Sequence, residues 1–267
     1  MTTAEAKPQP RTPFQRYRHS LWLLTKRDLR VRYATSALGY LWSILDPLLM
    51  AAIYFFVFVY IFHRGGVGEN PYIVFLLSAM LPWVWFNGSI SDSCRAYLRE
   101  AKLVRSTTIP RTIWVNRIVL SKGIEYVASL PVLAIFAIAF GAPVSWDALL
   151  FYPLAIVLQI ALTVGLGFIV APLVVFFRDL ERAVKLILRL MFYGTPIIYA
   201  ANDVPGGFHK LTMFNPLNGI FSLYRAPFFP QALHWPTVGV AIGMTAVILV
   251  IGIAVFARTE RAVLKEI

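Results

Sequence analysis

The sequence predicts an all-α integral membrane protein, and three observations carry this prediction: its composition, its long apolar segments and the placement of its positive charges. Hydrophobic residues make up 58% of the 267 residues, and the mean hydropathy is +0.68. A soluble domain of this size cannot bury so much apolar surface. Because hydrocarbon offers no partner to backbone N–H and C=O groups, each apolar segment of membrane length should form a helix. The short alternating segments of a membrane β-barrel do not occur in the sequence.

Six segments are apolar over about the 20 residues that a membrane-spanning helix needs. The first and the last are the most uniform. Pro82 interrupts the second, and charged residues occupy the beginning of the third. The predicted spans are residues 41–62, 72–94, 112–140, 146–177, 183–199 and 236–256.

The apolar segment 201–235 precedes the last span and is broken by Pro205, Pro216, Pro227 and Pro230. Its pieces of about a dozen residues are too short to cross a bilayer. A re-entrant helix pair on the extracytoplasmic side fits this pattern if protein or water covers its turn. The alternative is an ordinary extracytoplasmic loop that lies on the membrane surface.

All but three of the 25 Lys and Arg residues fall on one predicted side of the membrane, and the other side holds Arg64, Lys210 and Arg225. The positive-inside rule therefore places both termini in the cytoplasm. The net charge of +12 is distributed along the predicted membrane edges. This distribution favours anionic lipid headgroups as the partner of these charges. It does not indicate a nucleic acid partner.

Two segments precede the first span. Residues 1–13 are rich in proline and lack the apolar core of a signal peptide, so we expect a disordered cytoplasmic lead and a retained first span. On a helical wheel the apolar residues of 14–33 share one arc and most arginines share the opposite arc, which predicts an amphipathic helix in the headgroup plane. Asp28 lies near the apolar arc and is expected to pair with Arg32, four residues later. Residues 34–267 then form the transmembrane domain.

The sequence lacks the motifs of several enzyme and metal-site classes. No G-x-x-x-x-G-K-[ST] run occurs, so this chain cannot cradle ATP in a Walker loop. The four histidines have no metal-ligand spacing, and the single Cys94 excludes an internal disulfide and a cysteine metal site. The acidic residues near the membrane are not paired as a proton-driven carrier would favour. We therefore expect no metal and no cofactor in this chain.

Four stretches of the sequence stand out, and in order they are RDLRVRYATSALGYLWSILDPLL, LVRSTTIPR, FFRDLERAVKLILRLMFYGTPIIY and NPLNGIFSLYRAPFF. Together they resemble, at the usual spacing, the membrane subunits of type-2 ABC exporters for O-antigen, teichoic acid, capsule and mycobacterial galactan. The resemblance covers residues 14–267. Within that family the basic N-terminus and the first stretch are most similar to actinobacterial Wzm-type permeases that export lipid-linked galactan.

The resemblance implies a permease of the bacterial plasma membrane, a dimer of this chain with two copies of a separate ATPase that binds ATP and Mg²⁺. It assigns 99–111 as the segment that couples the permease to the ATPase, with a smaller contact in the turn after the fourth span. The residues assigned to coupling are Lys102, Leu103, Val104, Arg105 and Asp179. The alternative is that the charges only follow the positive-inside rule, but exposed apolar residues at 103 and 104 favour a partner.

The resemblance also implies a substrate, a glycan carried on a polyprenyl pyrophosphate. Three arginines lie where the cytoplasmic headgroup layer meets the first span and suit a pyrophosphate: Arg27, Arg30 and Arg32. Three neighbouring aromatic residues are candidates for a lateral gate between lipid and water: Tyr33, Tyr40 and Trp42. The alternative for both sets is an aromatic belt with snorkelling arginines.

A path for sugar needs aromatic rings and hydroxyl groups, and the candidates are Tyr54, Phe58, Tyr193 and Tyr199. The run Gly194-Thr195-Pro196 should kink the fifth span near its outer half. Asp46 precedes Pro47, and we expect it to cap the kinked start of the first span or to pair with an arginine.

Two other classes of function stay open. A polytopic membrane enzyme that acts on lipid-linked sugars would need clustered acids or histidines, and Asp92, Glu125 and Asp179 are spread too thinly along the sequence to predict such a cluster. A secondary carrier or channel would run without ATP.

Overall fold

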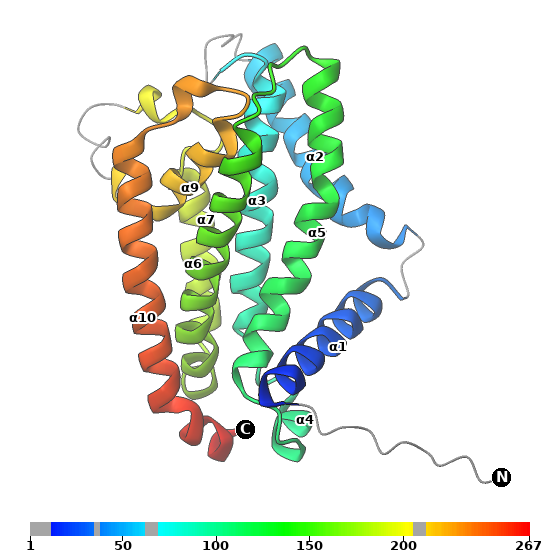
Figure 1. Ribbon diagram of the computed structural model, residues 1–267, viewed down its shortest axis with the longest axis vertical. Helices are drawn as coiled ribbons and strands as arrows, with labels where there is room; N and C mark the ends of the chain where they lie inside the picture. The colour runs from blue at the N-terminus through cyan, green and yellow to red at the C-terminus, as the bar shows by residue number, and fades with distance from the viewer. Residues whose placement is uncertain (1–11, 35–37, 62–68, 205–211) are drawn as a thin grey trace, which may run out of the picture.

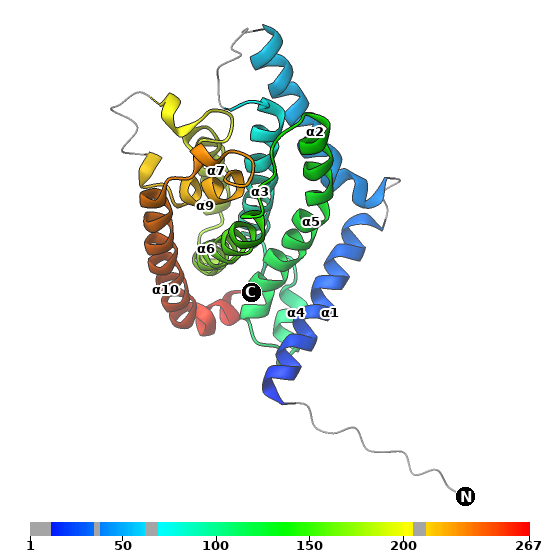
Figure 2. The same cartoon turned by 45° about the horizontal axis from the view of Figure 1, so that its top comes forward.

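A computed structural model of the chain describes residues 12–34, 38–61, 69–204 and 212–267. Within these ranges all regular structure is helical (Figures 1 and 2). Residues 1–11 of the predicted lead lie outside the described ranges. The longer helices are α1 (Pro13–Tyr33), α2 (Trp42–Phe55), α3 (Tyr72–Ser93), α5 (Thr112–Ala139), α6 (Ala148–Phe176), α7 (Leu180–Gly194), α9 (Pro216–Arg225) and α10 (Trp235–Glu266). The short ones are η1 (Gly39–Leu41), the π-helical η2 (Phe56–Ile61), α4 (Ala101–Ser106), η3 (Ala201–Asp203) and η4 (Pro230–Ala232).

Five helices are long and apolar enough to cross a membrane, judged by length and composition. They are α2 with η2 over Ile44–Ile61, then α3, α5, α6 and α10. These five match the predicted first, second, third, fourth and sixth spans. Because a long apolar run in hydrocarbon can only be helical, hydropathy alone was sufficient to locate them.

The predicted fifth span, 183–199, differs from the structure. Its helix α7 has 15 residues and ends at Gly194. At about 1.5 Å per residue this is roughly 22 Å, shorter than the ~30 Å hydrocarbon core. The helix stops there because Pro196 disfavours helical backbone at Thr195, which is extended. The kink expected at this run is therefore a helix end.

The chain beyond α7 continues along α3. At one end of α3, the Arg95 Nε donates to the Glu181 carboxylate at 2.7 Å, just inside α7. At the other end the Tyr72 hydroxyl donates to the Ile198 carbonyl oxygen at 2.9 Å. The segment 181–198 thus runs antiparallel to the whole of α3, as a helix followed by extended backbone. A sixth membrane crossing by this segment stays a prediction.

Helix α3 is the centre of the bundle, and most of its residues are buried. It contacts α2, α5, α6, α7 and α9. In Figure 2 it lies between α5 on one side and α6 and α7 on the other. Because α3 is apolar and buried on nearly every face, the other helices pack around it. The cavities described below all border α3 or the turns that follow it.

Helices α6 and α10 pack side by side in parallel through small residues. Phe151 meets Trp235 near the start of both helices, and Phe168 meets Phe256 further along. Between these ring pairs, a side chain at Gly252 would collide with the Gly165 carbonyl oxygen. Such close backbone approach is typical of helices that pack within membranes.

Within the described residues of the predicted re-entrant segment 201–235, α9 is the one helix longer than a single turn. The predicted pair of helices stays a prediction. The Asn215 side chain caps α9 by accepting from the Leu217 N–H, and Pro216 takes the first helical position. Residues Leu217 to Arg225 are all buried, mainly against α10, α6 and α3. This burial favours a segment inserted into the bundle over a loop on the membrane surface.

Helix α1 begins at Pro13, one residue before its predicted start. A reciprocal capping box between Thr12 and Gln15 begins it. It lies obliquely along the lower half of α5 in Figure 1, and its Tyr17 hydroxyl accepts from the Asn116 amide at 2.7 Å. Its placement in the headgroup plane stays a prediction.

Candidate functional site

A charged cleft of about 650 Å³ lies between α1, the end of α3 and the first half of α5. Six of its lining side chains are cationic and three are acidic. The cleft therefore carries a positive potential that attracts anions. Its lining residues are Arg27, Asp28, Val31, Arg32, Asp92, Arg95, Ala96, Arg99, Glu100, Arg117, Ile118 and Lys122.

Ion pairs hold this cleft together by joining α1 to α5 and to Glu100, the residue before α4. The Arg27 guanidinium donates to Glu100 at 2.6 Å, and that of Arg117 donates to Asp28 at 2.7 Å. Arg117 is only 3% exposed, so its charge depends on these carboxylates. Burial raises the pKa of the Asp28 carboxyl, although the Arg117 and Arg27 guanidinium groups act in the opposite direction. The expected pair between Asp28 and Arg32 is wrong, because Asp28 faces α5 and not the next turn of its own helix.

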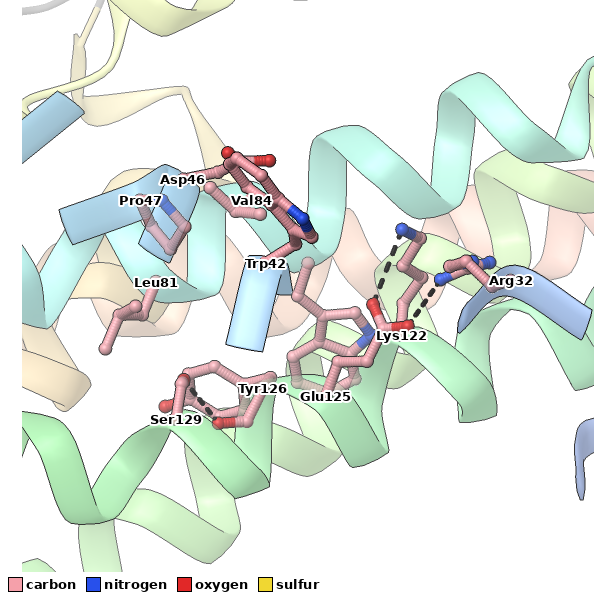
Figure 3. A pocket seen from close by; sticks show the side chains of 11 residues that line it. Arg32, Trp42, Asp46, Pro47, Leu81, Val84, Lys122, Glu125, Tyr126 and Ser129 are labelled. Atoms are coloured by element: carbon pink, nitrogen blue, oxygen red, sulfur yellow. Dashed lines mark hydrogen bonds and ion pairs between the residues drawn. The ribbon is translucent and has the colours of Figure 1, made fainter. Parts of the chain in front are cut away.

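Arg32 reaches the outer end of the cleft and is bound by acids from two other helices. Its Nη1 lies 2.6 Å from the Glu125 carboxylate and its Nη2 lies 3.4 Å from Asp92. Lys122 also approaches Glu125, at 3.4 Å. Figure 3 shows Arg32 and Lys122 converging on Glu125. The structure thus brings together Asp92 and Glu125, which the sequence pattern had suggested were too widely spread to cluster.

A chamber of about 250 Å³ begins at this ion pair. It is lined by Trp42 and Asp46 from α2 and by Glu125 and Tyr126 from α5 (Figure 3). The chamber shares Arg32 and Lys122 with the charged cleft. The two cavities are therefore neighbours across a single pair of cations.

An aromatic groove of about 570 Å³ follows on the other side of the chamber, between α2, α3 and α7. It shares Asp46, Pro47 and Val84 with the chamber. Its aromatic wall consists of Tyr54, Trp83, Phe192 and Tyr193, and its polar groups are Asp46, Asn87, Ser91, Lys185 and Arg189. Phe192 packs against both Tyr54 and Trp83, with ring centroids 5.8 Å and 5.6 Å apart. The three cavities form a series that begins with charge and ends with aromatic rings.

The chain matches the family model described as ABC-2 type transporter over residues 19–229. The chain belongs to this transporter family. Its relatives include the O-antigen export system permease protein RfbA of Klebsiella pneumoniae, 34% identical over 90% of this chain and 92% of the relative. RfbA of Myxococcus xanthus is 29% identical over 87% and 89%, and the polysialic acid transport protein KpsM of Escherichia coli is 25% identical over 96% and 99%.

The structure of this permease places the predicted pyrophosphate and gate residues in different surroundings. Arg27 and Arg32 line the charged cleft, whereas Arg30 is exposed on α1 and does not line it. Trp42 lines the chamber. The side chains of Tyr33 and Tyr40 lie outside the described residues. Asp46 lines two cavities. The start of α2 has no side-chain cap hydrogen bond among the described residues, and the pairing of Asp46 with an arginine stays a prediction.

The predicted glycan residues of the permease divide into two sets. Tyr54 and Tyr193 line the aromatic groove together, although 139 positions separate them in the sequence. Phe58 instead packs against Tyr72, with ring centroids 6.2 Å apart. The Tyr199 hydroxyl donates to the Tyr193 backbone carbonyl at 2.7 Å. Of these four residues, Tyr54 and Tyr193 therefore line the groove.

The coupling segment of the permease contains the short helix α4, which lies at the same end of the bundle as the C-terminus and the start of α1 (Figure 1). Lys102 and Arg105 are exposed on it, and Asp179 is exposed before α7. Val104 is fully buried in the permease's own core, and Leu103 packs partly against it. The expected exposure is therefore wrong for Val104, which α4 turns inward, whereas Leu103 is half-buried and its contact with a partner stays a prediction.

Several side chains of the site escaped the sequence-based prediction: Asp92, Lys122, Glu125, Lys185 and Arg189. Their signal was charge within or beside a predicted span, which is costly unless paired or hydrated. These charges pair with residues on other helices, which explains why the sequence did not predict their place in the site: Arg32 and Glu125, for example, are 93 positions apart. Among the described residues, no group of His, Cys, Asp and Glu is arranged to hold a metal ion.

Proposed function

We propose that the permease exports a polysaccharide carried on a polyprenyl pyrophosphate, from the cytoplasmic leaflet across the bacterial plasma membrane. Its relatives are named for O-antigen export and polysialic acid transport, which supports a polysaccharide as the cargo. The similarity of the first stretch to galactan exporters favours a galactan as the sugar. A separate ATPase supplies the energy and binds ATP and Mg²⁺.

The observation that carries this proposal is the order of the three cavities. Guanidinium groups bind phosphate through paired, charge-assisted hydrogen bonds, so the charged cleft suits the pyrophosphate. Amphipathic rings such as Trp42 tolerate both lipid and water, as a gate beside the chamber requires. Tyr54 and Tyr193 offer ring faces and hydroxyls to sugar in the aromatic groove. One lipid-linked glycan would meet these chemistries in this sequence.

The proposed assembly contains a second copy of this chain and two ATPase subunits. Lys102 and Arg105 are exposed on α4, at one end of the bundle, and suit a contact with the ATPase. We place this end and both termini in the cytoplasm, in agreement with the distribution of positive charge. Membrane lipid surrounds the assembly, and α1 lies on its cytoplasmic surface.

Transport in liposomes tests this function. The permease and its ATPase are reconstituted with a fluorescent polyprenyl-pyrophosphate glycan, and its movement between leaflets is followed with and without ATP. We expect transport only with ATP and the ATPase. Arg32→Ala should lower the rate at least tenfold, whereas Arg30→Ala, which alters an arginine outside the cleft, should lower it less.

A second variant in the same assay tests coupling. Lys102→Glu combined with Arg105→Glu should leave the permease folded and abolish the stimulation of ATP hydrolysis by substrate. Transport without ATPase would instead identify a carrier or channel, and cleavage of the glycan-lipid bond would identify an enzyme; either result would refute the proposed function.

A further inference from the structure

Glu125 stands at the point where the charged cleft meets the chamber. One of its carboxylate oxygens lies 2.6 Å from Arg32, and the other lies 3.4 Å from Lys122. Its side chain is only 9% exposed. Arg32 and Lys122 line both the charged cleft and the chamber. Glu125 therefore binds the two cations that lie between these cavities (Figure 3).

We propose that Glu125 is a competing anion built into the phosphate site. In the resting permease, Glu125 binds the Arg32 guanidinium. When the lipid phosphate binds, it replaces Glu125 as the partner of Arg32, and this exchange of anions releases the end of α1. This inference rests on the proposed function and adds the residue that sets the affinity of the site. Glu125 is in this sense a positioning residue, because it acts through Arg32.

The exchange is chemically balanced. A phosphate presents the same paired acceptor geometry to a guanidinium as a carboxylate does, so Arg32 passes from one anion to another without losing its hydrogen bonds. Glu125 keeps Lys122 as a partner when Arg32 leaves it. A buried carboxylate abandoned by its only cation would oppose the exchange strongly, and the second cation removes this obstacle.

The place of Arg32 on α1 explains why exchange would move the helix end. Nearer the middle of α1, Asp28 is bound to the buried Arg117 at 2.7 Å. Nearer its start, the Tyr17 hydroxyl accepts from Asn116 at 2.7 Å. Neither contact involves the exchanged anion. Loss of the contact between Arg32 and Glu125 therefore leaves the longer contact with Asp92, at 3.4 Å, to hold the last turn of α1, next to the link that leads into α2.

A binding and distance measurement on the purified permease in nanodiscs tests this inference. Farnesyl pyrophosphate is the probe, with farnesol and inorganic pyrophosphate as the two half-ligands. Spin labels are attached at Arg30→Cys on the last turns of α1 and Val127→Cys on α5, two exposed positions that do not line the charged cleft. The native Cys94 is buried and should stay unlabelled.

In the wild-type permease we expect farnesyl pyrophosphate to bind and to lengthen the distance between the labels, and farnesol to do neither. Glu125→Gln should bind farnesyl pyrophosphate at least fivefold more tightly and show the longer distance without ligand. Asp92→Asn removes the more distant partner of Arg32 and should shift both readouts in the same direction as Glu125→Gln. Its gain in affinity should be about twofold or less. Arg32→Gln should show the longer distance but lose binding, a combination that a merely structural role would not produce.

Asp147→Asn is the matched control. Asp147 is an exposed acid just before α6, accepts a hydrogen bond from the Ser145 hydroxyl at 2.8 Å and lines none of the three cavities. This variant should leave the affinity and the distance unchanged. If the wild type binds the probe and Glu125→Gln alters neither readout, the exchange is refuted while the proposed function stands. If the wild type does not bind farnesyl pyrophosphate at all, both are refuted.

Discussion

Arg225 is a buried arginine whose guanidinium binds backbone carbonyls. Its Nη1 donates to the Pro196 carbonyl at 2.6 Å and its Nη2 to the Ile197 carbonyl at 2.7 Å. The guanidinium also lies 3.6 Å from the centre of the Phe75 ring. These carbonyls belong to the extended backbone after α7, where no helical N–H is available to them. Arg225 thus stabilises the place where α7 ends inside the bundle.

Replacement of Arg225 by Met should destabilise the permease by about 2–5 kcal/mol, because two buried carbonyl oxygens lose their donors. Arg225→Lys should cost less, since an ammonium retains a donor but not the planar fork that reaches both oxygens. SDS-induced unfolding in mixed micelles measures the difference. Arg258→Met, at an exposed position on α10, should have little effect. Equal stability of Arg225→Met and Arg258→Met would contradict the assigned role.

At the scale of single residues, the sequence predicted which charges lie near the cleft better than it predicted their partners. Arg27 and Arg32 line the cleft as expected from their place before the first span. The partner of Arg32 could not be predicted, because Glu125 lies on a different helix and only the packing of α1 against α5 brings them together. A local rule such as pairing at four-residue spacing gave the wrong answer for Asp28.

Among the helices, α7 shows where reasoning from hydropathy fails. Its apolar residues lie on one side and its charged residues lie on the other, so its mean hydropathy suggests a span only when the apolar residues after Gly194 are counted. The extended segment after it is apolar too, but its carbonyls are satisfied by Arg225 from α9. Hydropathy reports which residues avoid water, and it does not report how their backbone is satisfied. For the five helices of membrane length the two questions have the same answer.

The contact between α6 and α10 depends on Gly252. An added methyl group there would meet the Gly165 backbone, so Gly252→Ala should force the two helices apart and destabilise the permease by about 1–3 kcal/mol. Gly243→Ala is the matched control on the same helix, because an added methyl group meets nothing within 4 Å. The unfolding assay in mixed micelles compares the two variants. A loss of stability in both, or in neither, would show that this backbone contact does not determine the packing.

In the whole molecule, the side formed by α2 and α7 differs from the other faces. Only 11% of the residues in the spanning segment Ile44–Ile61, formed by α2 and η2, are buried. Helix α7 contacts mainly α3 and α6. This side carries Lys185 and Arg189 in the aromatic groove beside exposed apolar residues of α7. Charged groups at membrane depth require water or a partner, whereas α10 exposes an apolar surface that lipid can cover. We therefore predict that, in the proposed dimer, the α2 and α7 side faces the second copy across a hydrated path.

Disulfide cross-linking in membranes tests this arrangement. In a two-fold dimer the same surface meets itself, so a cysteine near the axis pairs with its own copy. Leu190→Cys on α7, 64% exposed, and Ile53→Cys on α2, 55% exposed, should yield cross-linked dimers on mild oxidation. Val250→Cys on α10 is 66% exposed but faces lipid in this arrangement, so it should stay monomeric. Cross-linking through Val250 and not through α2 or α7 would place the second copy against α10 and leave the aromatic groove open to lipid, which its two cations could not tolerate.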